Sequence, residues 1–275
     1  MSRTTFDVQG RTAYAYTGGK AFDATLPCVV FIHGALHDHS VWTLLARYFA
    51  HHGRSVLAVD LPGHGRSAGP ALADVAALGG WINALLDTAG VVGDGAVSLV
   101  GHSMGSLIAL EAAAQRPARV ARLALVATAW PMKVSDALLS TSRERPKAAM
   151  AMVNAFSHST TAGKPSYPGP GAWMHGGNQA LMERMQDGYA DGNLFEHDFL
   201  VCDRYQGAPD AVAQMTAAGV PAHLILGAKD AMTPPKAAKA LAEMLQARVQ
   251  TLPAGHSLMT EAPEGMLNAL KAALG

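Results

Sequence analysis

Residues 97–110 read VSLVGHSMGSLIAL and decide the fold of this chain. The first half of the stretch is short, apolar and β-branched, as in a buried strand, whereas apolar residues in the second half recur at helical spacing. The segment between them predicts a tight turn with Ser103 at its tip. Gly101 and Gly105 flank that turn, where a Cβ atom would collide with the strand or the helix.

A serine at such a turn is presented above the carboxyl edge of a sheet. The helix that follows begins with unpaired N–H groups, so the amide of Met104 can bind the negative oxygen that forms when Ser103 attacks a carbonyl group. The five-residue pattern also occurs in ordinary glycine-flanked turns. Its meaning therefore depends on the rest of the chain.

The composition favours an ordinary globular protein that binds a small molecule. The 275 residues can form one large α/β domain, 49% of them are hydrophobic and 15% are charged. Because 21 basic residues balance 21 acidic residues, no net field attracts nucleic acid or an anionic membrane surface. We expect a small neutral organic substrate and water as partners.

The cysteines and the N-terminus indicate a reduced compartment. Cys28 and Cys202 are expected to be buried free thiols, and neither lies in a Cys-x-x-Cys motif. We predict no metal and no cofactor. The polar stretch Met1–Gly10 lacks the pattern of a signal peptide, and no apolar run approaches the roughly 20 residues of a membrane span. A cytoplasmic protein is expected.

Strands and helices alternate along most of the chain, which predicts parallel crossovers and a doubly wound α/β sheet. An antiparallel edge strand is expected at 12–16. The expected parallel strands are 28–32, 55–59, 97–100, 123–126, 222–226 and 248–252. Helices are expected at 40–52, 71–89, 106–115, 237–245 and 263–274.

The alternation stops at about residue 133 and resumes at about 216, which predicts an inserted helical cap. The expected division is core 1–132, cap 133–215 and core 216–275. The cap is rich in methionine and contains a proline- and glycine-rich loop at 163–171. Flexible methionines and aromatic side chains suit an adaptable apolar pocket. The candidate lining residues are Leu36, Trp130, Trp173 and Met174.

Three residues appear in an order that suits nucleophilic catalysis. A serine hydroxyl needs a base to take its proton, and a histidine does this when a third group orients it. Ser103, Asp230 and His256 follow the order Ser…Asp…His, and each lies just past an expected strand. All three should therefore meet at one edge of the sheet, where open α/β sheets place their sites. The assigned roles are nucleophile, orienting acid and base.

Five motifs together resemble the α/β-hydrolase superfamily over nearly the whole chain. They are HGA at 33–35, DLPGHGRS at 60–67, GHSMG at 101–105, GAKD at 227–230 and GH at 255–256. The resemblance implies an eight-stranded, mostly parallel sheet, a cap after the sixth strand and hydrolysis without a cofactor. It also implies that the amide of Ala35 is the second donor of an oxyanion hole. Asp60 and Arg66 are expected to shape their loop rather than to catalyse.

We therefore predict a serine hydrolase that cleaves a small, mainly apolar carboxylic ester through an acyl-enzyme. Haloalkane dehalogenases and epoxide hydrolases carry an aspartate at the position of Ser103, which argues against both. C–C bond hydrolases are similar in build but typically have tryptophan after the catalytic histidine, where this chain has Ser257. A C–C bond or lactone hydrolase, a perhydrolase or haloperoxidase, and a ligand-binding receptor of the same fold remain alternatives.

Overall fold

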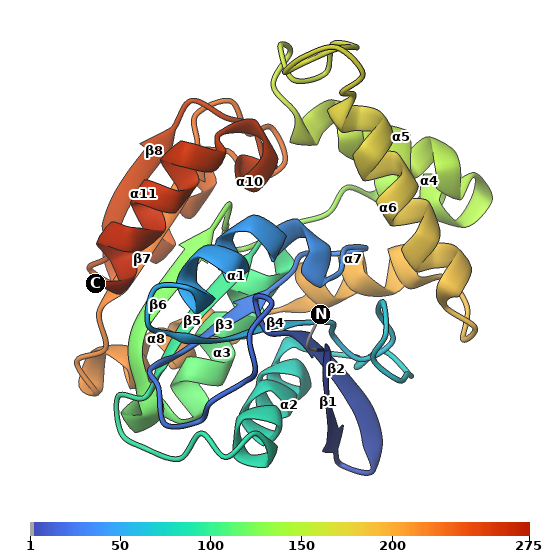
Figure 1. The fold of residues 1–275 in the computed structure, drawn as a ribbon. Coiled ribbons are helices and arrows are strands. Elements are labelled where there is room, and N and C mark those ends of the chain that lie inside the picture. The colour runs from blue at the N-terminus through green and yellow to red at the C-terminus, as the bar shows by residue number, and fades with distance from the viewer. Residues whose placement is uncertain (1–2) are drawn as a thin grey trace.

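A computed structural model describes residues 3–275, so Met1 and Ser2 of the N-terminal stretch lie outside the described residues (Figure 1). Eight strands form one sheet in the order β1-β2-β4-β3-β5-β6-β7-β8. The strands are β1 (Arg3–Val8), β2 (Arg11–Tyr16), β3 (Cys28–Ile32), β4 (Ser55–Val59), β5 (Val97–His102), β6 (Val120–Val126), β7 (Ala222–Gly227) and β8 (Arg248–Leu252). Strands β3 to β8 pair in parallel, which confirms the predicted eight-stranded, mostly parallel sheet.

The antiparallel end of the sheet has one more strand than the sequence predicted, since residues 12–16 were expected to form the edge strand. Strand β2 is not an edge strand, because β1 pairs with it over its whole length, from Arg3 to Val8. The two strands form a hairpin in which Gln9 and Gly10 have positive φ and Asp7 accepts a hydrogen bond from the Gly10 N–H. Strand β1 is largely polar, so its sequence carries little of the apolar alternation that marks a strand.

Helices cover both faces of the sheet (Figure 1). One apolar layer lies between the sheet and helices α2, α3 and α8, and the other lies between the sheet and helices α1 and α11. The helices of these layers and their neighbours are α1 (Thr43–Ala50), α2 (Val75–Thr88), α3 (Met104–Gln115), α8 (Ala208–Ala217), α9 (Lys239–Met244), α10 (Leu258–Glu261) and α11 (Pro263–Leu274). Short 3-10 turns lie at His39–Trp42, Pro117–Arg119 and Pro235–Ala238.

Helix α2 begins later than the expected residue 71 because of a local cap. The Asp74 side chain accepts a hydrogen bond from the Ala77 N–H at 2.7 Å, which satisfies one of the free donors of the first turn. The four residues before Val75 therefore remain outside the helix.

A separate lobe of helices lies above the carboxyl edge of the sheet (Figure 1). It contains α4 (Asp136–Glu144), α5 (Pro146–Ser157), α6 (Met174–Gly188) and the first part of α7 (Leu194–Arg204). These helices share an apolar cluster that includes Phe195 and Phe199, whose rings stack with centroids 4.5 Å apart. The end of α7 and all of α8 instead pack into the core of the sheet, although they precede residue 215. We call the lobe of α4, α5, α6 and the first part of α7 the cap.

Within residues 3–275, no helix combines the length and the apolar character that crossing a membrane requires.

Truncation of the cap's central aromatic residue tests this packing. Phe195 is fully buried, so Phe195→Ala should lower the free energy of unfolding by about 3–5 kcal/mol through lost apolar contacts and a cavity. Leu44→Ala is the control, because that side chain is 73% exposed and its truncation should cost about 0.5 kcal/mol or less. Chemical denaturation measures both values, and equal losses would contradict the described packing.

Candidate active site

The turn between β5 and α3 holds Ser103 in a strained conformation. Its backbone lies at φ 53° and ψ −120°, a region that side chains other than glycine seldom adopt. A Cβ atom at Gly101 would collide with the carbonyl oxygen of Gly105, and one at Gly105 would collide with the carbonyl oxygen of Ile32. The two glycines therefore let β5, α3 and β3 approach closely beneath the serine.

A buried carboxylate and an imidazole form a hydrogen-bonded pair at the ends of β7 and β8. His256 Nδ1 donates to Asp230 Oδ2 at 2.8 Å. Asp230 also accepts from the backbone N–H groups of Met232 at 2.8 Å and Thr233 at 2.9 Å. Burial raises the pKa of Asp230, but the attraction of His256 and these hydrogen bonds outweigh it and lower the pKa overall. Asp230 is therefore an anion that orients His256 with Nε2 free to take a proton.

Thr233 supports this pair and was not identified from the sequence. Its hydroxyl oxygen lies 2.8 Å from Asp230 Oδ2, 3.1 Å from His256 Nδ1 and 2.9 Å from the carbonyl oxygen of Ala127. The hydroxyl therefore connects the carboxylate and the imidazole to the end of β6. Its position three residues after the aspartate, in the same turn, was the available signal.

Ser103, His256 and Ala35 line one cavity of about 60 Å³ between the sheet and the cap. Met104 is the first residue of α3, where backbone N–H groups have no partner within the helix. The apolar part of the lining comes from Met132, Val134, Val153, Met182, Phe199 and Met232. The Ser103 hydroxyl, the His256 imidazole and Ala35 therefore border one small, mainly apolar space.

None of the four pocket residues expected from the sequence lines the cavity of Ser103 itself. Leu36 is fully buried in the apolar cluster of the cap, and Trp130 packs against the core of the sheet. Trp173 is 57% exposed, and its ring packs against Gly176 in the next turn of α6. Met174 lines a neighbouring cavity rather than that of Ser103. The methionine and aromatic character expected of the pocket is supplied by other residues, because the packing of the cap determines which side chains face the serine.

A buried carboxylate of the cap fixes the loop that carries Ala35. Asp198 Oδ2, on α7, accepts from the Leu36 N–H and from His64 Nε2, both at 2.8 Å. Leu36 has φ 54°, so this contact stabilises a strained residue directly after Ala35. Burial opposes both charges, but mutual attraction and hydrogen bonding raise the pKa of His64 and lower the pKa of Asp198. No sequence motif pointed to Asp198.

The end of helix α5 binds the two loops that carry the acid and the base. The carbonyl oxygen of Ser157 accepts from the His256 N–H at 2.6 Å, and that of Phe156 accepts from the Ala231 N–H at 3.3 Å. A Cβ atom at Gly255 would approach the Ser157 oxygen to 2.5 Å, so glycine is required there for contact. The cap and the acid–base pair are therefore joined through the backbone.

Asp60 shapes its loop, as predicted. Its carboxylate accepts from the backbone N–H groups of His39 at 2.8 Å and Arg66 at 2.9 Å. Oxygen and nitrogen atoms of Asp38, His39 and Asp60 lie close enough together to hold a metal ion. His39 Nδ1 already lies 2.7 Å from Asp60 Oδ1, however, and Asp38 bonds Ser40 and Arg184. Hydrogen bonds within the protein thus already occupy these atoms.

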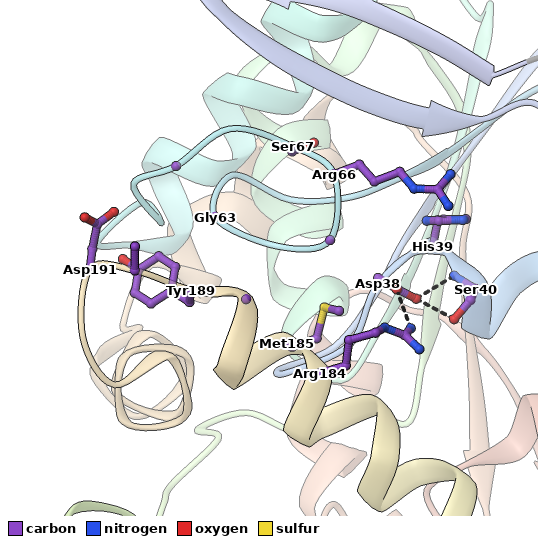
Figure 2. A pocket seen from close by; sticks show the side chains of 14 residues that line it. Asp38, His39, Ser40, Gly63, Arg66, Ser67, Arg184, Met185, Tyr189 and Asp191 are labelled. Atoms are coloured by element: carbon purple, nitrogen blue, oxygen red, sulfur yellow. Dashed lines mark hydrogen bonds and ion pairs between the residues drawn. The ribbon is translucent and has the colours of Figure 1, made fainter.

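A large hollow lies beside this cluster, between α6 and the loop 62–70 (Figure 2). It measures about 640 Å³ and is lined by both acidic and basic side chains, among them Arg66, Arg184 and Asp191. It shares no lining residue with the cavity of Ser103. The chemistry expected of Ser103 therefore belongs to the smaller cavity.

Cys28 and Cys202 are both free and buried, as expected from the sequence. Burial raises the pKa of the Cys28 thiol to about 12, which keeps it protonated and unreactive at neutral pH.

Comparison with protein families identifies the chain. The sequence model described as the alpha/beta hydrolase family matches residues 29–269. The chain belongs to this family. The matched region begins in β3 and ends in α11, so it includes the strained turn, the buried pair and the cap.

Individual relatives of this alpha/beta hydrolase include esterases and lipases. The esterase from Exiguobacterium antarcticum superposes with a TM-score of 0.78 at 19% identity, covering 98% of each chain. The enol-lactonase from Burkholderia xenovorans gives 0.77 at 20% identity, covering 98% of this chain and 99% of that one. Lipase LipV from Mycobacterium tuberculosis is 37% identical over 118 residues, which cover 41% of this chain and 43% of the lipase. The chain spans about a third to under half of the length of the curated relatives it matches.

The buried pair of Asp198 and His64 predicts a pH-dependent stability. The raised pKa of His64 adds stability below its unfolded-state pKa of about 6.5, and this stability is lost as the pH rises through the folded-state pKa. In Asp198→Asn, burial without a charged partner should lower the pKa of His64. Breaking a buried pair typically costs about 3–5 kcal/mol. The loss of Tm in Asp198→Asn, relative to wild type, should therefore be larger at pH 5.5, where wild-type His64 is stabilised in its charged form, than at pH 8.

Thermal unfolding of wild type and variant at both pH values measures this difference. Asp94→Asn is the control, since Asp94 is exposed and its removal should change Tm little at either pH. A deficit of Asp198→Asn that is the same at pH 5.5 and pH 8 would show that His64 does not depend on this carboxylate for its charge.

Proposed function

We propose that this protein is a serine hydrolase that cleaves a small, mainly apolar carboxylic ester. The observation that carries the proposal is the strained Ser103 at the edge of the cavity that His256 also lines. The esterase, lactonase and lipase among its relatives support the same class of chemistry.

The first step is attack by Ser103 on the ester carbonyl carbon. His256 Nε2 takes the hydroxyl proton as the Ser103 Oγ–carbon bond forms, and Asp230 stabilises the resulting imidazolium. The amides of Ala35 and Met104 donate hydrogen bonds to the carbonyl oxygen as it becomes negative. Loss of one such donor typically costs about a hundredfold or more in rate.

The second half of the reaction releases the acid. The protonated His256 gives its proton to the leaving alkoxide oxygen as the carbon–oxygen bond breaks, which leaves an acyl-enzyme on Ser103 and a free alcohol. His256 then takes a proton from water, whose oxygen attacks the acyl carbon. Collapse of this second intermediate returns the proton to Ser103 and frees the carboxylic acid.

The size and the lining of the cavity favour a short acyl group. A space of about 60 Å³ holds only a few water molecules, and methionine, valine and phenylalanine side chains form most of its apolar wall. Lys133, which lines the cavity, is paired with Asp203 at 3.5 Å, and Asp230, behind His256, is paired with that imidazole at 2.8 Å. Uncharged esters therefore fit better than ionic ones.

Removal of the nucleophile tests the proposal. Ser103→Ala should lower kcat for a short p-nitrophenyl ester by a factor on the order of 10⁴ or more, because no other group can form the acyl-enzyme. Asp230→Asn should lower kcat to a similar degree, about 10⁴-fold, by allowing the wrong tautomer of His256. Release of p-nitrophenol measures both rates.

Circular dichroism and Tm are the controls for folding of these variants. Undiminished turnover by well-folded Ser103→Ala would overturn the assignment of the nucleophile. A wild-type protein that binds esters tightly but hydrolyses none of a panel of esters, lactones and vinylogous diketones would instead indicate a receptor. Preference for the diketones would indicate a C–C hydrolase.

A further inference from the structure

A second cavity lies directly beside that of Ser103. It measures about 250 Å³, and its apolar wall is formed by Val41, Met174, Leu181 and Met259. We call it the outer cavity, and the cavity of Ser103 the inner cavity. His37 and Asn178 line both cavities. These two side chains are therefore the partition between them.

One hydrogen bond joins the two side chains of the partition, His37 of the core and Asn178 of the cap. His37 Nε2 lies 2.9 Å from Asn178 Oδ1, and Asn178 in turn donates to Asn154 on α5 at 2.8 Å. Burial lowers the pKa of His37 to about 4, so its ring is neutral at physiological pH and Nε2 carries the donated proton. His37 Nδ1 is buried and has no hydrogen-bond partner in the part of the chain that the structure describes. A neutral pair of this kind separates without exposing a charge.

The inner cavity is too small for a complete ester of more than a few carbons. Small-molecule sites usually measure about 300–1,000 Å³, and only the two volumes taken together reach the lower end of that range. The larger groove in Figure 2 offers more space but shares no wall with the inner cavity. The outer cavity is thus the adjoining space into which a substrate can extend.

The position of the base indicates which half of the ester enters the outer cavity. In the proposed reaction His256 must protonate the leaving alcohol oxygen, so the alcohol lies on the His256 side of the scissile bond. Ser257, the next residue, lines the outer cavity. The apolar lining of the inner cavity, from the segment after β6, the cap and the Asp230 turn, is left for the acyl group.

We propose that the outer cavity is the subsite for an apolar alcohol arm, with His37 and Asn178 as the side chains that determine access to it. This inference rests on the proposed ester hydrolysis. It assigns the substrate as an ester of a short acyl group and a longer, uncharged aliphatic alcohol.

Two glycines of helix α6 provide a matched test. Gly177 lines the outer cavity and Gly188 lines the separate large groove, and both lie in α6. A Cβ atom at either position would have nothing within 4 Å. Gly177→Phe should therefore fill the outer cavity, whereas Gly188→Phe changes only the groove. Both replacements also favour the helix over glycine.

The experiment compares acetates of methyl to octyl alcohol with methyl esters of acetic to octanoic acid. Burial of one methylene is worth about fourfold in binding, so Gly177→Phe should lower kcat/KM for octyl acetate by about tenfold or more relative to methyl acetate. The acyl series should keep its wild-type profile, and Gly188→Phe should leave both series unchanged. A loss in the acyl series alone would show that the outer cavity holds the acid half, and an unchanged alcohol series would overturn the subsite.

A binding measurement separates this inference from the proposed chemistry. In the Ser103→Ala background, calorimetric titration with 1-octanol should show binding that Gly177→Phe weakens about tenfold or more and Gly188→Phe does not. Equal binding by both double variants would overturn the subsite even if wild-type protein hydrolyses esters. If octanol binds as expected but the wild type has no esterase activity, the proposed function fails and the apolar site stands.

Discussion

The close approach of three backbone segments beneath Ser103 is the constraint on which the structure depends. Strand β5, helix α3 and strand β3 come together where Gly101 and Gly105 have no side chains, and the serine between them takes a positive φ. The cost of that strained residue is of order 1–3 kcal/mol and is offset by the buried layers on both faces of the sheet. The parallel order of the strands then brings Asp230 and His256 to the same edge.

The cap makes polar contacts with the loops that carry Ala35, Asp230 and His256. Asp198 of α7 holds Leu36 next to Ala35, the end of α5 accepts hydrogen bonds from the His256 and Ala231 amides, and Asn178 of α6 bonds His37. Three helices of the cap thus contact three different loops of the core. A movement of the cap would therefore act on the loop that carries Ala35, on the pair of Asp230 and His256 and on the wall of the cavity together.

Membership of the alpha/beta hydrolase family leaves the substrate open, because the fold supports many reactions. The distinguishing features of this chain lie in the space above Ser103: a small inner cavity, a larger outer cavity and a neutral pair between them. These features arise where helices of the cap pack against loops of the core. The proposed preference for an alcohol arm depends on them rather than on the family.

The sequence by itself determined the sheet architecture and predicted the candidate residues at the edge of the sheet. Strand and helix periodicities, the glycines around Ser103 and the order of Ser103, Asp230 and His256 are local or ordered along the chain, so they can be read without coordinates. The hairpin of β1 was missed because its strand is mostly polar. The start of α2 was misplaced because a single cap at Asp74 decides it.

Only the tertiary structure decided which side chains face the serine. Trp173 and Met174 have the character expected of a pocket, yet the ring of Trp173 packs against Gly176, and Met174 lines the outer cavity rather than the inner one. Asp198 lies 162 residues from Leu36, and Asn178 lies 141 residues from His37, and no sequence motif marks either contact. Such contacts depend on how whole helices of the cap pack against the core. The spacing of residues along the chain does not predict that packing, because the contacting residues are far apart in the sequence.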